Sequence, residues 1–277
     1  MTGDPAGIWG TLSQAERDLA YNNNAAVASD QELIGLRNSA SLAYRAAYPD
    51  ALDVAYGPRE RNAWDLYPAP VLDAPCLVFI HGGYWQRNRR EDFACVAAGV
   101  RAHGWACAIP GYTLAPEVGL AGIVAEIDAA LDWLAEHGAA HGIGGKIILS
   151  GWSAGGHLAA LALGHSAVSA GLAISGVFEL GLIRDTYLNA ALQLTEDEVA
   201  ALSPLRLPPV NKMLTIAYGT RELPRLVADS RALHALRAEN HAPGPLVPVC
   251  GADHFTVLQE LCRPEGILTK LALSLAD

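Results

Sequence analysis

The chain has 277 residues, of which 51% are hydrophobic and 17% charged, so it is long and apolar enough to bury a large core and is not expected to be disordered. Its 29 acidic against 19 basic residues give a formal net charge of −10, which would repel nucleic-acid phosphates and anionic membranes, and we expect neither as a partner. Five cysteines without a CxxC pair indicate neither a disulfide framework nor a zinc site, and we expect no metal and no cofactor.

Residues 1–24 contain acidic, basic and asparagine side chains and no continuous apolar segment, so they do not resemble a secretory signal and we expect a cytoplasmic protein. Two amphipathic stretches, at 11–21 and 30–48, predict helices. Two short strands are expected next, at 52–56 and 63–67, separated by a turn rich in glycine, proline and asparagine.

From residue 76 onward, apolar runs alternate regularly with helical patterns. The apolar runs lie at 76–80, 105–109, 146–149, 172–177, 213–217 and 246–249, and the helical patterns near 91–103, 119–137, 154–164, 223–239 and 255–274. This alternation predicts a mostly parallel central sheet with helices on both faces. Residues 147–178 carry no Asp, Glu, Lys or Arg, as expected of a strand, helix and strand buried within such a sheet.

One connection, at about 179–211, is longer than a usual crossover and has a helical signal of its own, with Thr195 and Glu198 at capping-box spacing. We expect it to be a small lid inserted in a single domain that spans residues 1–277. No linker or repeat divides the chain. The sequence also leaves homodimerisation open.

The strand at 146–149 leads directly into Gly151-Trp152-Ser153-Ala154-Gly155 and then into a helix. This is a G-x-S-x-G pattern in the strand–turn–helix context that exposes a nucleophilic serine above a sheet. A glycine-rich turn of purely structural use is the alternative. We therefore expect Ser153 to be a nucleophile.

A serine nucleophile needs a histidine to take its proton and a carboxylate to orient that histidine. His254 follows the last predicted strand, where its loop would reach the turn that holds the serine. Glu222 follows the preceding strand and is the favoured carboxylate, with Asp229 and Asp253 as alternatives. Glu222 could instead be an ordinary acidic residue near a helix N-terminus.

The strand at 76–80 is followed by His81, Gly82, Gly83, Tyr84 and Trp85. The backbone N–H groups of the two glycines, together with the N–H of Ala154, are candidate donors to an oxyanion. We expect His81 to brace this loop. Tyr84 and Trp85 either line a substrate pocket or pack in the core. The cations that follow, Arg87, Arg89 and Arg90, could hold a substrate carboxylate, although a solvated charge cluster is the favoured interpretation.

With these segments placed, the chain resembles the α/β-hydrolase superfamily and, within it, the kynurenine formamidase (arylformamidase) family. The sequence HGGYWQ at 81–86 carries most of this resemblance, because many related esterases have HGGG there. Further similar segments lie at 12–21, 111–116, 153–155, 175–180, 191–194 and 253–255. In two positions the chain departs from vertebrate members, which have histidine in place of Trp152 and aspartate in place of Glu222.

The resemblance implies an α/β-hydrolase fold and a metal-free serine hydrolase that cleaves N-formylkynurenine. It implies Ser153 as nucleophile, His254 as general base and acid, and Gly82, Gly83 and Ala154 as oxyanion donors. Tyr84, Trp85 and Trp152 are the expected contacts to a small aromatic amide or ester. A carboxylesterase of short-acyl esters would use the same residues, and a binding protein on a retired hydrolase fold is a third hypothesis.

Overall fold

A computed structural model describes residues 9–277 and contains an eight-stranded sheet in the order β1-β2-β4-β3-β5-β6-β7-β8. The strands are β1 (Val54–Ala55), β2 (Ala63–Tyr67), β3 (Cys76–Ile80), β4 (Ala106–Pro110), β5 (Ile147–Trp152), β6 (Val168–Ile174), β7 (Leu214–Gly219) and β8 (Leu246–Val249). β2 pairs antiparallel with β1 and with β4, and all other pairs are parallel. The predicted mostly parallel sheet is thus confirmed.

Helices fill the connections between these strands. The α-helices are α2 (Gln14–Leu19), α3 (Asn23–Ala26), α4 (Asp30–Ala47), α5 (Ala97–Arg101), α6 (Leu120–His137), α7 (Ala154–Leu161), α8 (Leu180–Arg184), α9 (Asn189–Leu192), α10 (Glu196–Leu202), α11 (Pro224–Glu239), α12 (Gln259–Cys262) and α13 (Ile267–Ser274). Short 3-10 helices are η1 (Arg90–Val96), η2 (Gly138–His141), η3 (Ala162–Gly164), η4 (Pro204–Arg206) and η5 (Thr256–Leu258).

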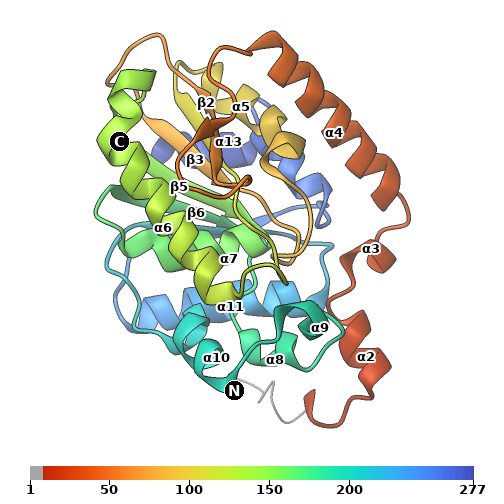
Figure 1. The fold of residues 1–277 in the computed structure, drawn as a ribbon. Coiled ribbons are helices and arrows are strands. Elements are labelled where there is room, and N and C mark those ends of the chain that lie inside the picture. Colours follow the sequence, from red (N-terminus) through yellow and green to blue (C-terminus); the bar gives the residue numbers. More distant parts are fainter. Residues whose placement is uncertain (1–8) are drawn as a thin grey trace.

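The helices form a layer on each face of the sheet (Figure 1). α6, α7 and α11 cover one face, whereas α5 and α13 cover the other, with α4 outside them. Successive residues of a strand point to opposite faces, so Ile148 of β5 packs in one core and Leu149 in the other. Both faces are buried, which explains why the central strands have continuous apolar sequences.

The helices expected over 255–274 and 91–103 differ most from the observed elements. The helix expected over 255–274 is interrupted, because Pro264 has no N–H to donate and Gly266 becomes the N-cap of α13. The helix expected over 91–103 begins as the 3-10 helix η1 and becomes α-helical only at α5. Both breaks lie on the face that carries Trp152 and the end of the chain.

The segment at 179–211 contains α8, α9, α10 and η4. Thr195 caps α10, and its side chain and that of Glu198 form the expected capping box. Leu180, Ile183 and Val199 are buried in the same core as α6 and α11, which ties the segment to that layer. Its role as a lid stays a prediction.

No helix within residues 9–277 is both long enough and apolar enough to cross a bilayer.

Candidate active site

Ser153 lies in the sharp turn between the central strand β5 and helix α7. Its backbone has φ 59° and ψ −121°, a conformation that costs a non-glycine residue energy and that persists only where the surrounding structure enforces it. Part of that enforcement is a hydrogen bond of 2.8 Å from the N–H of Ser153 to the carbonyl of Ile174 in β6. The side chain therefore sits at the carboxyl edge of the sheet, as the G-x-S-x-G pattern predicts.

Glu222 and His254 come together at the same edge, after β7 and β8 respectively. Oε2 of Glu222 lies 3.0 Å from Nδ1 of His254, and both side chains are almost completely buried. The other oxygen, Oε1, accepts hydrogen bonds from the hydroxyl of Ser175 at 2.5 Å and from the N–H of Gly219 at 2.6 Å. A carboxylate facing Nδ1 makes that nitrogen the donor and leaves Nε2 of the neutral ring as an acceptor.

The two alternative carboxylates are engaged elsewhere. Asp229 is buried and accepts hydrogen bonds from the N–H groups of Phe178 and Glu179, at 2.8 and 3.2 Å. Burial raises the pKa of Asp229 to about 7, against the opposing effect of those two N–H donors. Asp253 accepts from the backbone of its own loop. Of the three candidates, Glu222 is the one that contacts His254.

The loop after β3 brings Gly82 close to the turn that holds Ser153, and Gly83 follows it. A Cβ on Gly82 would lie 2.5 Å from the carbonyl oxygen of Trp152 and 2.8 Å from Cβ of Ser153, so glycine is required for this close approach. Gly83 has φ 123°, which side chains rarely adopt. Within residues 9–277, no protein acceptor pairs with the backbone N–H of Gly82, Gly83 or Ala154. These three N–H groups are available to an oxyanion.

His81 braces this loop, as expected. It is fully buried, stacks on Tyr112 with ring centres 4.3 Å apart, and donates from Nδ1 to the carbonyl of Gly82 at 2.9 Å. Burial lowers its pKa to about 3, so the ring remains neutral at ordinary pH. His81 therefore has a structural role in holding Gly82.

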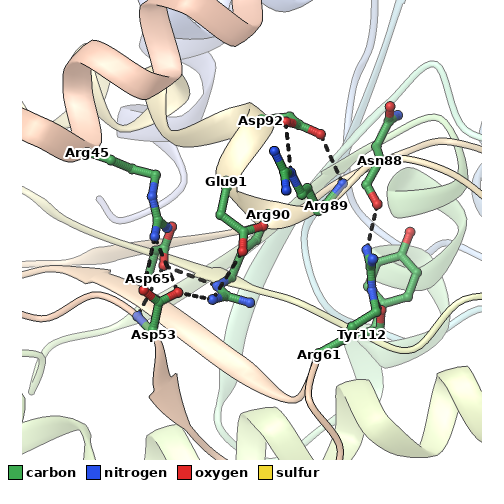
Figure 2. Close-up of polar contacts among 10 residues, drawn as sticks. All are labelled: Arg45, Asp53, Arg61, Asp65, Asn88, Arg89, Arg90, Glu91, Asp92 and Tyr112. Carbon is green, nitrogen blue, oxygen red and sulfur yellow. Dashed lines mark hydrogen bonds and ion pairs between the residues drawn. The ribbon is translucent and has the colours of Figure 1, made fainter.

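Ion pairs and hydrogen bonds of several arginines hold residues 88–92, which continue the loop after β3 (Figure 2). Arg90 pairs with Asp65 of β2 at 3.1 Å and also with Asp53 and Glu91, while Arg45 of α4 reaches the same two aspartates. Arg61 donates to the carbonyl of Asn88 at 2.5 Å and to that of Tyr112 at 2.9 Å.

The solvated-cluster interpretation is therefore wrong for Arg90, which is only 6% exposed. It holds for Arg89, which is exposed and pairs with Asp92 at 3.4 Å. The local sequence does not show that Arg90 is buried whereas Arg89 is exposed. The acidic partners of Arg90, Asp53 and Asp65, come from a distant part of the chain.

A cavity of about 230 Å³ contains both Ser153 and His254 in its lining, with no hydrogen bond between them. Tyr84 and Trp152 also line it, as predicted for substrate contacts. Trp85 does not: it is fully buried against His157, with ring centres 5.0 Å apart, and this placement corresponds to the core-packing alternative.

One part of the cavity lining was not recognised from the sequence patterns. It is formed by the N-terminal helices α3 and α4 through Asn23, Asn24, Gln31, Ile34 and Arg37. The run of three asparagines at 22–24, between two amphipathic stretches, was the feature of the sequence that could have indicated a polar site there. No residue of 179–211 lines this cavity. The described part of the chain also has no cluster of three or more His, Cys, Asp or Glu residues that could hold a metal ion.

The chain is similar to known hydrolases in sequence and in fold. The BD-FAE family model matches residues 65–173. A kynurenine formamidase from Danio rerio is 24% identical, covering 96% of this chain and 98% of the relative. A crystal structure of a protein from Silicibacter, described as a thioesterase, has a TM-score of 0.83 and 27% identity, with 93% of this chain and 99% of the other covered. Over almost its whole length the chain is similar to a kynurenine formamidase, and its fold is that of an α/β-hydrolase.

The same fold recurs at lower identity. Esterase B from Lactobacillus rhamnosis has a TM-score of 0.67 and 22% identity, with 90% of this chain and 96% of the other covered. The expected α/β-hydrolase fold is thus confirmed. In this α/β-hydrolase fold the turn with Ser153 follows β5, and the loops after β3, β7 and β8 surround it.

Proposed function

We propose that the protein is a serine hydrolase in which Ser153, His254 and Glu222 form the catalytic triad. One observation carries the proposal: a serine held at positive φ shares a cavity with a histidine whose Nδ1 is bound to a buried carboxylate. In this arrangement Nε2 of His254 takes the proton of the Ser153 hydroxyl. The direct contact between the two side chains is expected in the substrate complex, since catalytic hydrogen bonds are often long in free enzymes.

The reaction proceeds by acyl transfer in two steps. Oγ of Ser153 adds to the substrate carbonyl, and the negative charge on its oxygen is stabilised by the free N–H groups of Gly82, Gly83 and Ala154. His254 then gives its proton to the departing nitrogen or oxygen, which leaves an acyl-enzyme. Water attacks this ester with His254 as base, and the acid and free serine are released.

The proposed substrate is an aryl N-acyl amide, in particular an aryl formamide such as N-formylkynurenine. The full-length similarity to a kynurenine formamidase supports this choice. An anilide is also easier to cleave than a peptide bond, because the ring competes for the nitrogen lone pair and His254 can supply the proton that the leaving nitrogen needs.

A carboxylesterase of short-acyl esters is the second candidate function. A second cavity of about 170 Å³ adjoins the first, because Trp152, Phe255, Ile34 and Arg37 line both. Most of its remaining lining is apolar, including Leu33 and Leu258, so it could receive an acyl chain larger than formyl. Similarity to structures described as a thioesterase and an esterase also favours this candidate.

The test is a kinetic panel of aryl formamides, longer aryl amides, aryl esters and an acyl thioester on one preparation. Amide cleavage led by the formamides supports the proposed function, whereas cleavage of esters or thioesters alone supports the second candidate. Ser153→Ala should abolish both turnover and labelling by a fluorophosphonate probe. Labelling that persists in this variant would show that another residue is the nucleophile.

A further inference from the structure

The lining of the cavity around Ser153 has an excess of basic over acidic side chains, in contrast to the protein as a whole. Two arginines, Arg37 and Arg87, line it, and its lining contains no Asp or Glu. The chain carries a formal net charge of −10, so a cavity with two cations and no acid is a local exception. Such a cavity attracts an anionic group to the position where the reaction occurs.

Arg37 lies on α4 at the boundary between the two cavities, and its side chain is largely removed from solvent. Within the described part of the chain it has no carboxylate within ion-pair distance, unlike Arg45 of the same helix, which pairs with Asp65. Its Nε and Nη2 donate instead to the side-chain oxygen of Asn38, at 3.2 and 2.8 Å, and its guanidinium lies 4.1 Å from the ring centre of Phe93.

Burial lowers the pKa of Arg37, although a guanidinium remains charged at every ordinary pH. Asp92 attracts this cation but is paired with Arg89, so Arg37 is buried without a direct ion pair, which is costly. A bound anion would compensate for this cost, because a planar guanidinium offers parallel donors that match the two oxygens of a carboxylate.

Arg87 lies on the exposed rim of the same cavity. It also has no acidic partner among residues 9–277, and its backbone N–H donates to the carbonyl of Gly83 at 3.0 Å. This bond ties Arg87 to the loop that presents the oxyanion donors. The guanidinium of Arg87, which also interacts with Tyr187, is therefore carried by the same loop that borders Ser153.

We propose that Arg37 and Arg87 bind a carboxylate on the leaving group of the substrate, so that the enzyme prefers aryl amides with an anionic side chain. This inference rests on the proposed function and makes its substrate class more specific. Asn24, Gln31 and Asn88 also line the cavity. The amide nitrogens of Asn24 and Gln31 each donate one hydrogen bond to Asp30, that of Asn88 donates to the carbonyl of Gly82, and each keeps a second N–H for the bound group.

The experiment compares two matched pairs of substrates. The first pair is 4-(2-formamidophenyl)-4-oxobutanoate and its neutral primary amide, and the second is 3-(4-acetoxyphenyl)propanoate and its primary amide. The wild-type protein should show a kcat/KM about tenfold or more higher for the anionic member of a pair, as expected of a charge-assisted contact. Added salt should reduce this preference.

Arg37→Gln and Arg87→Gln should each bring the anionic and neutral kcat/KM values of a pair closer together, and Arg37→Lys should restore part of the preference. Arg89→Gln is the matched control, because Arg89 is exposed, pairs with Asp92 and does not line the cavity. Its preference should equal that of the wild type. Equal losses on both members of a pair in the Arg37 and Arg87 variants would overturn the proposal, as would a wild type without preference.

The acetate pair separates this inference from the proposed function. Cleavage of acetates alone, with the anionic member preferred, would reject formamide hydrolysis and support the carboxylate site. Calorimetric binding of 4-oxo-4-phenylbutanoate gives a readout that needs no turnover. Binding that weakens in Arg37→Gln and not in Arg89→Gln supports the site, and no binding to the wild type counts against it.

Discussion

The indole Nε1 of Trp152 donates a hydrogen bond of 2.9 Å to the backbone carbonyl of His254, and the centres of the two side-chain rings are 4.7 Å apart. The residue that precedes the proposed nucleophile therefore holds the backbone of the proposed base. This contact joins the end of β5 to the loop after β8, two segments about a hundred residues apart in the chain. It gives Trp152 a positioning role besides its place in the cavity wall.

Replacing Trp152 by phenylalanine tests that role. The variant keeps an aromatic ring and loses the donor, so we expect a decrease of about 1 kcal/mol in the free energy of unfolding. We also expect kcat to fall about three- to tenfold, because His254 becomes less well positioned. Trp133→Phe, on α6 beside His137 and His141, is the control and should leave kcat unchanged. An unchanged kcat in Trp152→Phe would contradict the positioning role.

Glu222 is proposed to orient His254 and to stabilise its protonated form. Glu222→Gln keeps the size of the side chain and removes the charge, so kcat should fall by about 10²- to 10⁴-fold with a smaller change in KM. Glu222→Asp retains the charge on a shorter side chain and should keep more activity than the glutamine variant. Steady-state kinetics on the best substrate of the panel provide the measurement. Equal activity of wild type and Glu222→Gln would exclude Glu222 from the triad.

A methyl group on Gly82 would point at the nucleophile turn. Because its Cβ would meet the carbonyl oxygen of Trp152 and Cβ of Ser153, Gly82→Ala must move the loop that carries the oxyanion donors. Loss of a donor of this kind costs about 10²- to 10³-fold in kcat. Gly35→Ala is the control, since a Cβ at Gly35 meets no atom within 4 Å and alanine favours the helix. Wild-type kcat in Gly82→Ala would argue against the proposed oxyanion site.

Asp229 should make stability depend on pH. Burial raises its pKa in the folded protein to about 7, from an ordinary value of 3.8. A raised carboxyl pKa gives a contribution that is fully present below pH 3.8 and is lost as the pH rises through 7. This contribution amounts to at most ~4 kcal/mol, since one pKa unit corresponds to about 1.4 kcal/mol.

Asp229→Asn removes the titration and keeps an oxygen that can accept from Phe178 and Glu179. Urea unfolding at a series of pH values should therefore show the wild type losing stability relative to the variant between about pH 4 and 7. Comparing the two proteins cancels the opposite effect of His81 and His157, whose pKa values burial lowers to about 3 and 4. A difference that does not change with pH would contradict the raised pKa.

The positions of the proposed site residues follow from the order of the strands along the chain. Parallel strands end at the same edge of a sheet, so Ser153 after β5 and His254 after β8 could be expected at one edge from their sequence positions. Which carboxylate meets His254 could not be predicted in the same way. Asp253 is adjacent to it in sequence, yet the loop turns that side chain back on its own backbone, and Glu222 reaches the imidazole instead.

The sequence by itself determined the eight strands, the turn at Ser153 and the glycine loop that faces it, because apolar runs and glycine positions act locally on the backbone. The tertiary structure decided that the N-terminal helices, with Arg37, line the cavity that contains Ser153, that Arg90 is buried, and that Trp152 binds His254. Each of these depends on side chains from distant segments packing together, and neither periodicity nor spacing within one segment specifies such contacts.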